Sequence, residues 1–407
     1  MPSKTETKKK EFENRLEAYE EIAPLKKVMM WGEPGSEAVL AQLLPKEVSL
    51  FYDEFNVLEA REEFKGAVKL LESQGVEVVL VKDLLAEMIE STADYSEVSA
   101  EELIRELSLL GESYHDTHKG KEIADIGILD DLTEMVESDV IKYGENVAVR
   151  INQILSMNGE LPLANVMYAR DQSNLLGTAW IWSSMTHPIR RAEVALYRAA
   201  LEHAGLFDSS GLDIVQVSGE GRLEGGDGIV HNGICYIGVG GRTNLKGVMQ
   251  VAPSILNQGL RLMVPYDVQR NRGAKSEMSA MHLDTYWMPC GDNQVVACID
   301  EANQRILLEI VKTEKGDIEI VRLGKFGDHL VEEGFDVIPL TKAEQKDFAP
   351  NFLNLGNNRV VLSLSEGNDL EEELGKREIE VHSADLVNIT KGYGGLHCMT
   401  AALQRGS

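Results

Sequence analysis

Four short segments combine acidic side chains, a histidine and a cysteine, the residue types that carry out acid–base and nucleophilic chemistry. Asp171 follows Tyr-Ala-Arg at the end of a predicted strand, and Glu224 lies in Leu-Glu-Gly-Gly-Asp. His282 and Asp284 lie in Met-His-Leu-Asp-Thr, where a spacing of two predicts one strand face. Cys398 follows Gly-Gly-Leu-His, and these glycines give a backbone that can expose the thiol and approach a ligand closely.

Taken singly, each residue has an ordinary structural explanation. Glu224 and Asp227 suit a turn or a strand end. A lone cysteine is more often a small buried hydrophobic residue than a nucleophile. His282-Leu-Asp284 could be part of a metal site, but no HExxH motif or second histidine cluster accompanies it. The paired glycines lack the context of a phosphate-binding loop. The evidence therefore lies in the combination of segments.

Composition and charge restrict the classes of partner. The 407 residues are 43% hydrophobic and 26% charged, which is typical of a soluble globular protein. The formal net charge of −27 disfavours binding to nucleic acid or to an anionic membrane. It would attract a basic substrate such as a guanidinium compound, although acidic charge that only maintains solubility explains it equally well.

Cysteine usage and the N-terminal sequence indicate a cytoplasmic location. The four cysteines form no CxxC pair, and such scattered usage fits a reducing compartment. Residues 1–10 are polar and basic without an apolar segment, so we expect no signal peptide. No apolar run approaches the length of a membrane span.

The chain divides into an α/β part and a helical part. Residues 25–31 form an apolar strand, residues 56–73 have helical apolar spacing, and residues 76–81 predict a buried strand. From residue 83 to residue 154 the pattern is helical and charged. The predicted organisation is a disordered tail at 1–12, an α/β catalytic domain at 13–82 and 155–407, and an inserted helical domain at 83–154.

After residue 161, a hairpin, a helix and a strand recur. We expect strands at 165–168, 178–183, 212–217, 260–264 and 378–381, helices at 188–204, 244–257 and near 369, and hairpins over Asn232-Gly233 and Asn357-Asn358. Residues 285–340 fit the same plan less clearly. The recurrence favours a closed, propeller-like α/β arrangement over an open doubly wound sheet, since hairpins imply antiparallel pairing.

The four segments occur in the same order as the signature motifs of the arginine deiminase family, and the chain resembles that family. The resemblance extends to the N-terminal regions Leu25–Pro34 and Phe51–Leu85. Arginine deiminases share the guanidine-modifying superfamily with amidinotransferases. The resemblance covers nearly the whole chain. It implies an α/β, pentein-type propeller of five ββαβ units around a pseudo-fivefold axis, with an inserted helical domain. It also implies a central active site that needs neither a metal nor an organic cofactor.

The resemblance assigns a role to each chemical residue. Asp171 and Asp284 would hold the guanidinium nitrogens through paired charge-assisted hydrogen bonds. Cys398 would attack the central carbon to form an S-alkylthiouronium intermediate. His282 would protonate the departing ammonia and then activate water. Glu224 would orient His282 and stabilise its charge.

Other residues would select the substrate. Matches to the family's carboxylate-binding positions are Asn165, Arg190 and Arg242, although Arg190 could be a solvated helix residue. Asp227 joins them as a substrate-binding candidate. Tyr393 stands five residues before the cysteine, where arginine deiminases commonly have an arginine. Tyr393 can offer a hydrogen bond but no charge, which nearby Lys391 could supply.

Hydrolysis of L-arginine to citrulline and ammonia is the leading hypothesis. The alternatives are an amidinotransferase that passes the amidino group to an amine, a hydrolase of another guanidino acid, and a binding protein without catalysis. A binding protein would be expected to have lost Cys398 or His282, and both are present. The expected partner is a small guanidino molecule, not nucleic acid or membrane, and a homo-oligomer is compatible with the sequence.

Overall fold

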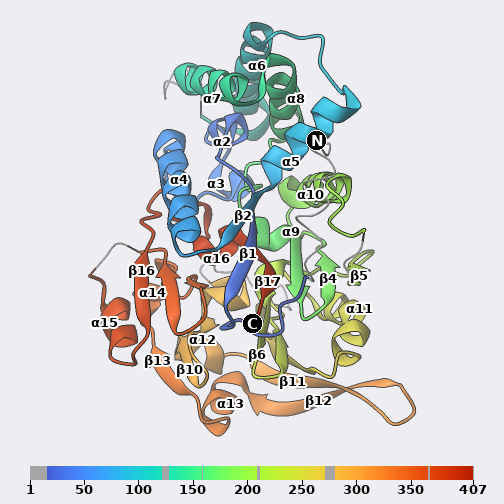
Figure 1. Ribbon diagram of the computed structural model, residues 1–407, viewed down its shortest axis with the longest axis vertical. Helices are drawn as coiled ribbons and strands as arrows, with labels where there is room; N and C mark the ends of the chain where they lie inside the picture. The colour runs from blue at the N-terminus through green and yellow to red at the C-terminus, as the bar shows by residue number, and fades with distance from the viewer. Residues whose placement is uncertain are drawn as a thin grey trace.

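The computed structural model describes residues 16–121, 128–157, 159–208, 211–270, 280–364 and 367–406. The predicted tail at 1–12 lies outside these residues. Helices α2 and α5–α8 gather at one end of the long axis, and most of the strands lie toward the other end (Figure 1). The fold class is therefore α/β, and each helix within the described ranges is too short or too polar to cross a bilayer.

Within the described residues, the strands form five small sheets that repeat one pairing scheme. In the first, β1 (Leu25–Met30) lies between antiparallel β17 (Thr400–Arg405) and parallel β2 (Glu77–Leu80). In each of the other sheets, too, a central strand lies between an antiparallel neighbour, given first, and a parallel one. β4 (Ala179–Trp182) lies between β3 (Ser173–Leu176) and β5 (Asp213–Gln216), and β7 (Ile234–Ile237) lies between β6 (Gly228–His231) and β8 (Arg261–Tyr266). β10 (Gln294–Ala297) lies between β9 (Trp287–Pro289) and β13 (Asp336–Pro339), and β15 (Arg359–Leu362) lies between β14 (Leu353–Asn354) and β16 (Glu380–Ser383). A long hairpin, β11 (Ile306–Lys312) and β12 (Ile318–Lys325), extends the β8 edge.

The helices connect these strands. They are α2 (Ser36–Ala41), α3 (Lys46–Ser49), α4 (Val57–Ser73), α5 (Val81–Thr92), α6 (Ala100–His118), α7 (Ile128–Tyr143), α8 (Glu145–Ser156), α9 (Ala169–Gln172), α10 (Arg191–His203), α11 (Leu245–Leu256), α12 (Ile299–Asn303), α13 (Phe326–Glu332), α14 (Lys342–Lys346), α15 (Asp369–Gly375) and α16 (Leu396–Met399). Short 3-10 turns are η2 (Pro188–Arg190), η3 (Gly225–Asp227), η6 (Leu283–Thr285) and η7 (Ile389–Gly392). Asn56 caps α4 through the N–H of Glu59, which explains the predicted start of this helix.

Both predicted asparagine turns form hairpins. Asn232 and Gly233 have φ angles of 51° and 72°, and Asn357 and Asn358 both have φ of 55°. Two consecutive left-handed residues are what a two-residue type I′ turn requires, and asparagine tolerates them better than most residues. The turn between β6 and β7 therefore follows directly from local sequence.

The helical region is attached to the first sheet through a buried polar network. Nζ of Lys82, in α5, lies 2.9 Å from both carboxylate oxygens of Asp139, in α7. Nδ2 of Asn152, in α8, donates to the same carboxylate across 2.9 Å, and the hydroxyl of Ser36, in α2, donates to Asn152. Because the Asp139 carboxylate accepts hydrogen bonds from both Lys82 and Asn152, this buried network fixes how the four helices pack against one another.

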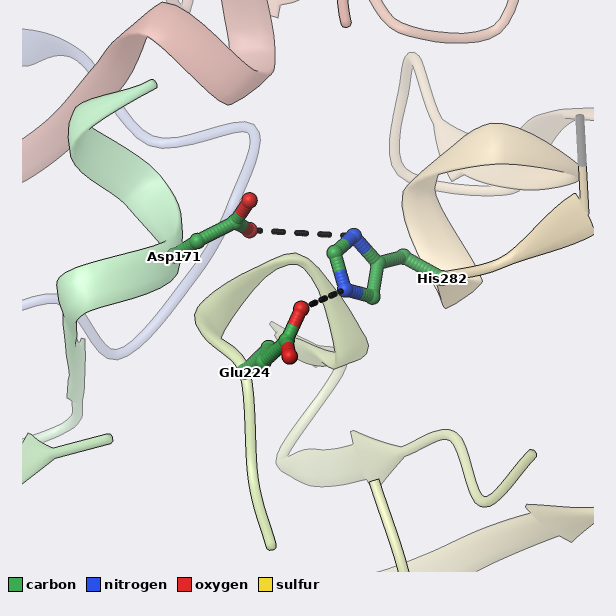
Figure 2. A group of neighbouring side chains, drawn as sticks. All are labelled: Asp171, Glu224 and His282. Carbon is green, nitrogen blue, oxygen red and sulfur yellow. Dashed lines mark hydrogen bonds and ion pairs between the residues drawn. The ribbon is translucent and has the colours of Figure 1, made fainter. Parts of the chain in front are cut away.

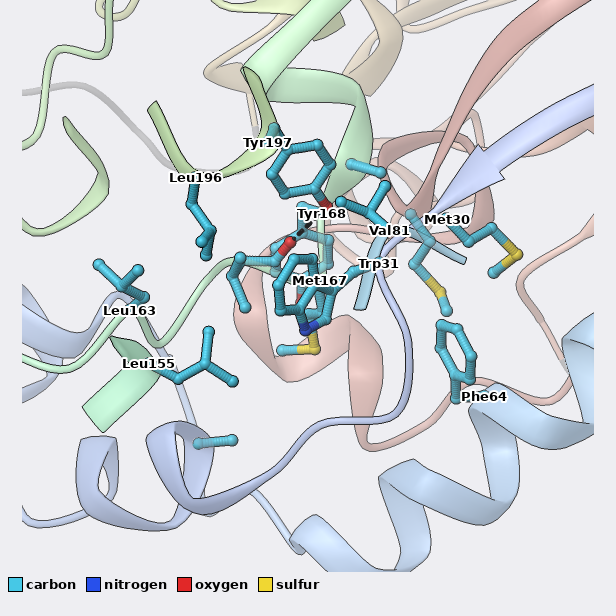
Figure 3. Packing of buried hydrophobic residues seen from close by; sticks show 14 of the residues in the cluster. Met30, Trp31, Phe64, Val81, Leu155, Leu163, Met167, Tyr168, Leu196 and Tyr197 are labelled. Atoms are coloured by element: carbon cyan, nitrogen blue, oxygen red, sulfur yellow. Dashed lines mark hydrogen bonds between the residues drawn. The ribbon is translucent and has the colours of Figure 1, made fainter. Parts of the chain in front are cut away.

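A large apolar cluster packs behind the segment that precedes Asp171. Figure 3 shows Met167 and Tyr168 of that segment beside Trp31 and Tyr197. The Trp31 and Tyr197 ring centroids lie 5.4 Å apart, and the Tyr197 hydroxyl donates to the carbonyl of Val166 across 2.8 Å. This packing holds the entry to α9 rigidly.

Two predicted strands are wrong. Residues 165–168 form a turn, and Asp171 lies in the short helix α9. The carbonyls of Asn165 and Val166 accept hydrogen bonds from Arg190 and Tyr197 instead of pairing with a strand. Similarly, Asp284 lies in the 3-10 turn η6, because the main-chain N–H of Leu283 is held by the Asp227 carboxylate.

Candidate active site

The five predicted chemical residues converge although they come from separate elements. Asp171 is in α9, Glu224 precedes η3, His282 precedes η6, Asp284 is in η6 and Cys398 is in α16. Each side chain is essentially inaccessible to solvent. Burial of three carboxylates, an imidazole and a thiol in one place is costly unless their charges and hydrogen bonds are matched.

His282 lies between two carboxylates (Figure 2). Its Nε2 is 3.1 Å from Oε2 of Glu224, and its Nδ1 is 3.7 Å from Oδ1 of Asp171. Burial alone would lower the pKa of His282, but the Asp171 charge and the Glu224 hydrogen bond raise it to about 9. The imidazole is therefore protonated at neutral pH and can supply a proton.

Glu224 is held in its ionised form. Its Oε2 also accepts from Nη1 of Arg242 at 3.1 Å, and its Oε1 accepts from the N–H of Thr186 at 2.9 Å. Burial would raise the pKa of Glu224, yet Arg242 and His282 lower it well below the usual range. A charged, immobilised carboxylate at this position fixes the orientation of the imidazole.

Cys398 is held at its main chain by Asn351. Oδ1 of Asn351 accepts from the N–H groups of Gly395 and Cys398 at 2.8 and 3.1 Å. The Cys398 sulfur lies 3.7 Å from Oδ2 of Asp284. Burial, followed by the charges of Asp284 and Asp171, raises the pKa of the Cys398 thiol well above its ordinary value. The thiol is therefore neutral until a positive charge arrives.

The expectation of an exposed thiol is wrong. Cys398 is 1% exposed, and the preceding glycines serve close packing instead. A Cβ atom on Gly394 would lie 2.9 Å from Cβ of Cys398 and 2.7 Å from the ring of Tyr168. Gly394 therefore lets Tyr168 pack directly against the cysteine segment.

Several buried acceptor atoms of the site have no hydrogen-bond partner within the described chain. They are Oδ1 of Asp171, Oδ1 of Asp284 and Oδ2 of Asp227. Leaving a buried polar atom unpaired typically costs about 1–3 kcal/mol, and more for a charged group. Such a set suits a planar cation that offers several N–H donors.

The two candidate arginines lie in the site but contact its acidic residues. Nη1 of Arg190 is 2.6 Å from Oδ2 of Asp171, and Nη2 is 3.0 Å from Oε2 of Glu193. Nη2 of Arg190 also donates to the carbonyl of Asn165, whose side chain donates to the carbonyl of Ser49. Arg190 is thus buried beside Asp171, so its interpretation as a solvated helix residue is wrong.

The remaining candidates, Asp227 and Tyr393, have different surroundings. Asp227 accepts from the N–H of Leu283 at 3.0 Å, and burial raises the pKa of Asp227 to about 7. Tyr393 is half-buried with a left-handed φ of 67°, and its ring centroid lies 5.1 Å from that of Tyr52 and 6.3 Å from that of Phe348. The position at which the family resemblance predicts an arginine is therefore part of an aromatic cluster here.

Sequence reasoning missed several residues that hold the site. Asn351 and Thr186 contribute hydrogen bonds to Cys398 and Glu224, and nothing in their local sequence indicates this. Glu193 binds Arg190, three residues before it. His397 contacts Asp284 at 2.7 Å, and its place next to Cys398 in the motif was the available signal.

Asp171, Glu224 and His282 also offer three possible metal-ligand atoms within 4.8 Å of one another. A ligating histidine nitrogen must be unprotonated. Because the two carboxylates raise the pKa of His282 to about 9, a metal ion would have to displace a proton from this ring at neutral pH.

Comparisons with known proteins agree on one family. A family model described as arginine deiminase matches residues 48–405. The arginine deiminases of Streptococcus sanguinis and Listeria innocua are 27% and 25% identical to this chain, and the alignments cover 96% and 97% of it and 98% and 100% of those proteins.

Two solved structures show a similar fold at low identity. A Pseudomonas aeruginosa dimethylarginine dimethylaminohydrolase variant in complex with citrulline has a TM-score of 0.55 and 14% identity, over 93% of this chain and 99% of that one. The N-terminal domain of a cyanobacterial arginine dihydrolase, bound to product, has a TM-score of 0.54 and 12% identity, over 93% and 98%. The chain thus shares their fold, of pentein type with mixed α/β sheets.

Proposed function

Because the chain belongs to the arginine deiminase family, we propose that it hydrolyses the guanidinium group of L-arginine to L-citrulline and ammonia. The observation that carries the proposal is a pair of buried carboxylate oxygens that accept no hydrogen bond from the described chain, Oδ1 of Asp171 and Oδ1 of Asp284, in the site that holds the Cys398 sulfur. A guanidinium bound between these carboxylates would satisfy both and bring its central carbon to the thiol.

Substrate binding would also activate the nucleophile. Burial, together with the charges of Asp284 and Asp171, raises the pKa of the Cys398 thiol and keeps it protonated in the free enzyme. A bound guanidinium supplies a compensating positive charge next to the sulfur, and His282 supplies another. Both would lower the pKa of the thiol and favour the thiolate when the substrate is in place.

The chemistry then proceeds in two halves. The Cys398 thiolate forms a bond to the guanidinium carbon, and His282 donates its proton to one terminal nitrogen, which leaves as ammonia. The neutral His282 next removes a proton from water, and the resulting hydroxide attacks the S-alkylthiouronium carbon. As the C–S bond breaks, the hydroxyl proton of the adduct passes to the sulfur, which releases citrulline and restores the Cys398 thiol, whose own proton was lost to solvent when the thiolate formed. One water is consumed for each ammonia released.

Substrate selection would involve Asn165, Arg190, Arg242, Asp227 and Tyr393. In the structure, Arg190 and Arg242 pair with Asp171 and Glu224. We therefore assign them a second role, which is to hold these two carboxylates in place.

We extend the proposal to the architecture and the location of the protein. Five sheets with one pairing scheme, together with the return of β17 to β1, support five ββαβ units around a pseudo-fivefold axis. Helices α5–α8 support a helical insertion at 83–154 into a catalytic domain formed by 13–82 and 155–407. The four free cysteines support a cytoplasmic location.

The direct test is to incubate the purified protein with L-arginine and to quantify ammonia and citrulline together. We expect equimolar products that Cys398→Ala abolishes and that Cys235→Ala, a buried cysteine of β7, retains. If neither product forms, L-arginine hydrolysis is wrong. If ornithine appears only when an acceptor amine is added, the protein is an amidinotransferase.

A further inference from the structure

The residue before the nucleophile is a buried histidine that lies between two carboxylates. His397 is inaccessible to solvent, and its Nδ1 lies 2.7 Å from Oδ2 of Asp284. On the other side of the ring, Nε2 lies 3.7 Å from Oε1 of Glu21. His397 thus connects the residue beside the Cys398 sulfur with a residue at the start of the described chain.

Charges alternate behind His397. Nη2 of Arg405, in β17, lies 2.7 Å from Oε1 of Glu21. Burial would raise the pKa of Glu21, but Arg405 and His397 lower it to about 2, so Glu21 is ionised. Nε of Arg170, in α9, donates to the carbonyl of His397 across 3.2 Å. The order from the interior to the sulfur is therefore Arg405, Glu21, His397, Asp284 and Cys398.

Each ring nitrogen of His397 faces a carboxylate oxygen, Nδ1 that of Asp284 and Nε2 that of Glu21. If only Nδ1 carried a proton, the lone pair on Nε2 would face the ionised carboxylate of Glu21 inside the protein. If only Nε2 carried a proton, the lone pair on Nδ1 would face Asp284 across 2.7 Å. A proton on each nitrogen replaces both repulsive contacts by attractive ones.

We propose that His397 is a positioning residue whose imidazolium holds Oδ2 of Asp284, so that Oδ1 faces the substrate, and offsets the Asp284 charge beside Cys398. This inference rests on the proposed function. It explains how a carboxylate can lie 3.7 Å from a sulfur that must become a thiolate. His282 then handles the protons of the reaction, while His397 keeps its own.

The protonation state of His397 can be measured by a method that does not depend on catalytic activity. We would record ¹⁵N NMR spectra of histidine-labelled protein at pH 7 and assign the His397 signals by their loss in His397→Asn. Two protonated ring nitrogens are expected. A neutral tautomer at pH 7 would overturn the proposal, whatever the protein does with arginine.

The effect on the nucleophile is a second measurement. In His397→Asn, the amide can still donate to Asp284 but carries no charge. We expect the pH dependence of Cys398 inactivation by 2-chloroacetamidine to move to higher pH by about one unit, which is a tenfold loss of thiolate at a given pH. L-Arginine turnover should show a larger loss in kcat than change in KM.

The matched control is His382→Asn, which removes a half-buried histidine of β16 that pairs with Glu380. We expect this variant to retain the inactivation profile. An unchanged profile in His397→Asn, or a loss of thermal stability without a change in profile, would indicate a merely structural histidine. Because inactivation follows Cys398 itself, this result is separable from a failure of arginine hydrolysis.

Discussion

Arg190 and Asp171 form a buried ion pair across 2.6 Å that occupies Oδ2 of Asp171 and leaves its Oδ1 facing Nδ1 of His282 across 3.7 Å. Glu193 holds the opposite edge of the Arg190 guanidinium. Arg190 therefore sets the direction of Asp171, in addition to any contact with a substrate carboxylate.

Replacement of Arg190 should distinguish these two roles. Arg190→Gln removes a charge-assisted contact of about 2–3 kcal/mol, so we expect kcat/KM for L-arginine to fall by roughly 30- to 160-fold. If Arg190 positions Asp171, a guanidino substrate without a carboxylate will lose a similar factor. The control is Arg191→Gln at the exposed neighbouring residue, which should retain activity. A loss confined to carboxylated substrates would contradict the positioning role.

Gly226 makes room for the histidine. A Cβ atom at this position would lie 2.7 Å from Nδ1 of His282 and 3.1 Å from Oδ1 of Asp284. We expect Gly226→Ala to displace the imidazole and to reduce kcat by about a hundredfold or more, since small misplacements of catalytic groups have effects of this size. Gly66→Ala, in α4, is the control, because nothing lies within 4 Å of the added atom. It should keep full activity and gain about 1 kcal/mol in stability.

The raised pKa of His282 predicts a particular dependence on pH. The folded state raises this pKa from 6.5 to about 9, so the associated stabilisation is complete below pH 6.5 and is lost as pH rises through 9. The difference in free energy of unfolding between the wild type and His282→Gln should shrink across that window in urea titrations. The kcat for arginine should also decline as pH passes 9. A constant difference in stability would show that His282 is not charged in the folded protein.

Tyr393 should govern how the substrate tail binds. Tyr393→Phe keeps the ring beside Tyr52 but removes the hydroxyl, and loss of one hydrogen bond of about 1 kcal/mol would raise KM for L-arginine about fivefold. Tyr393→Arg adds the charge that relatives have, and we expect a lower KM for L-arginine but not for agmatine, which lacks the carboxylate. Equal changes for both substrates would place Tyr393 outside the carboxylate-binding region.

Local sequence predicted the elements whose geometry is decided locally. The Asn232-Gly233 turn and the Asn56 cap of α4 are examples, because turn and cap geometry depend on a few adjacent side chains. Residues 165–168, which precede α9, and the segment around η6 were predicted wrongly as strands. Their hydrogen bonds go to Arg190, Tyr197 and Asp227, which are distant in sequence and are not visible in a periodicity.

In the candidate site, too, some residues could be predicted from local sequence and others depend on contacts between distant segments. The order of the motifs identified the residues with chemical groups, and the structure places all five together. Asn351 and Thr186 could not be found in this way, because each acts through a hydrogen bond formed only after distant elements pack. The burial of Cys398 was also missed, since the glycines beside it permit exposure and close packing alike.

The pairing of β1 with β17 has a consequence for how the protein acquires activity. Leu25 pairs with Arg405, so this strand pair closes a loop that contains nearly all of the described chain. Contacts this distant in sequence form slowly during folding, because the entropy of loop closure must be lost before they become favourable. Cys398 directly precedes β17. In a refolding experiment, regain of helical signal should therefore precede regain of catalysis, and the interval between them should report when the two ends of the described chain meet.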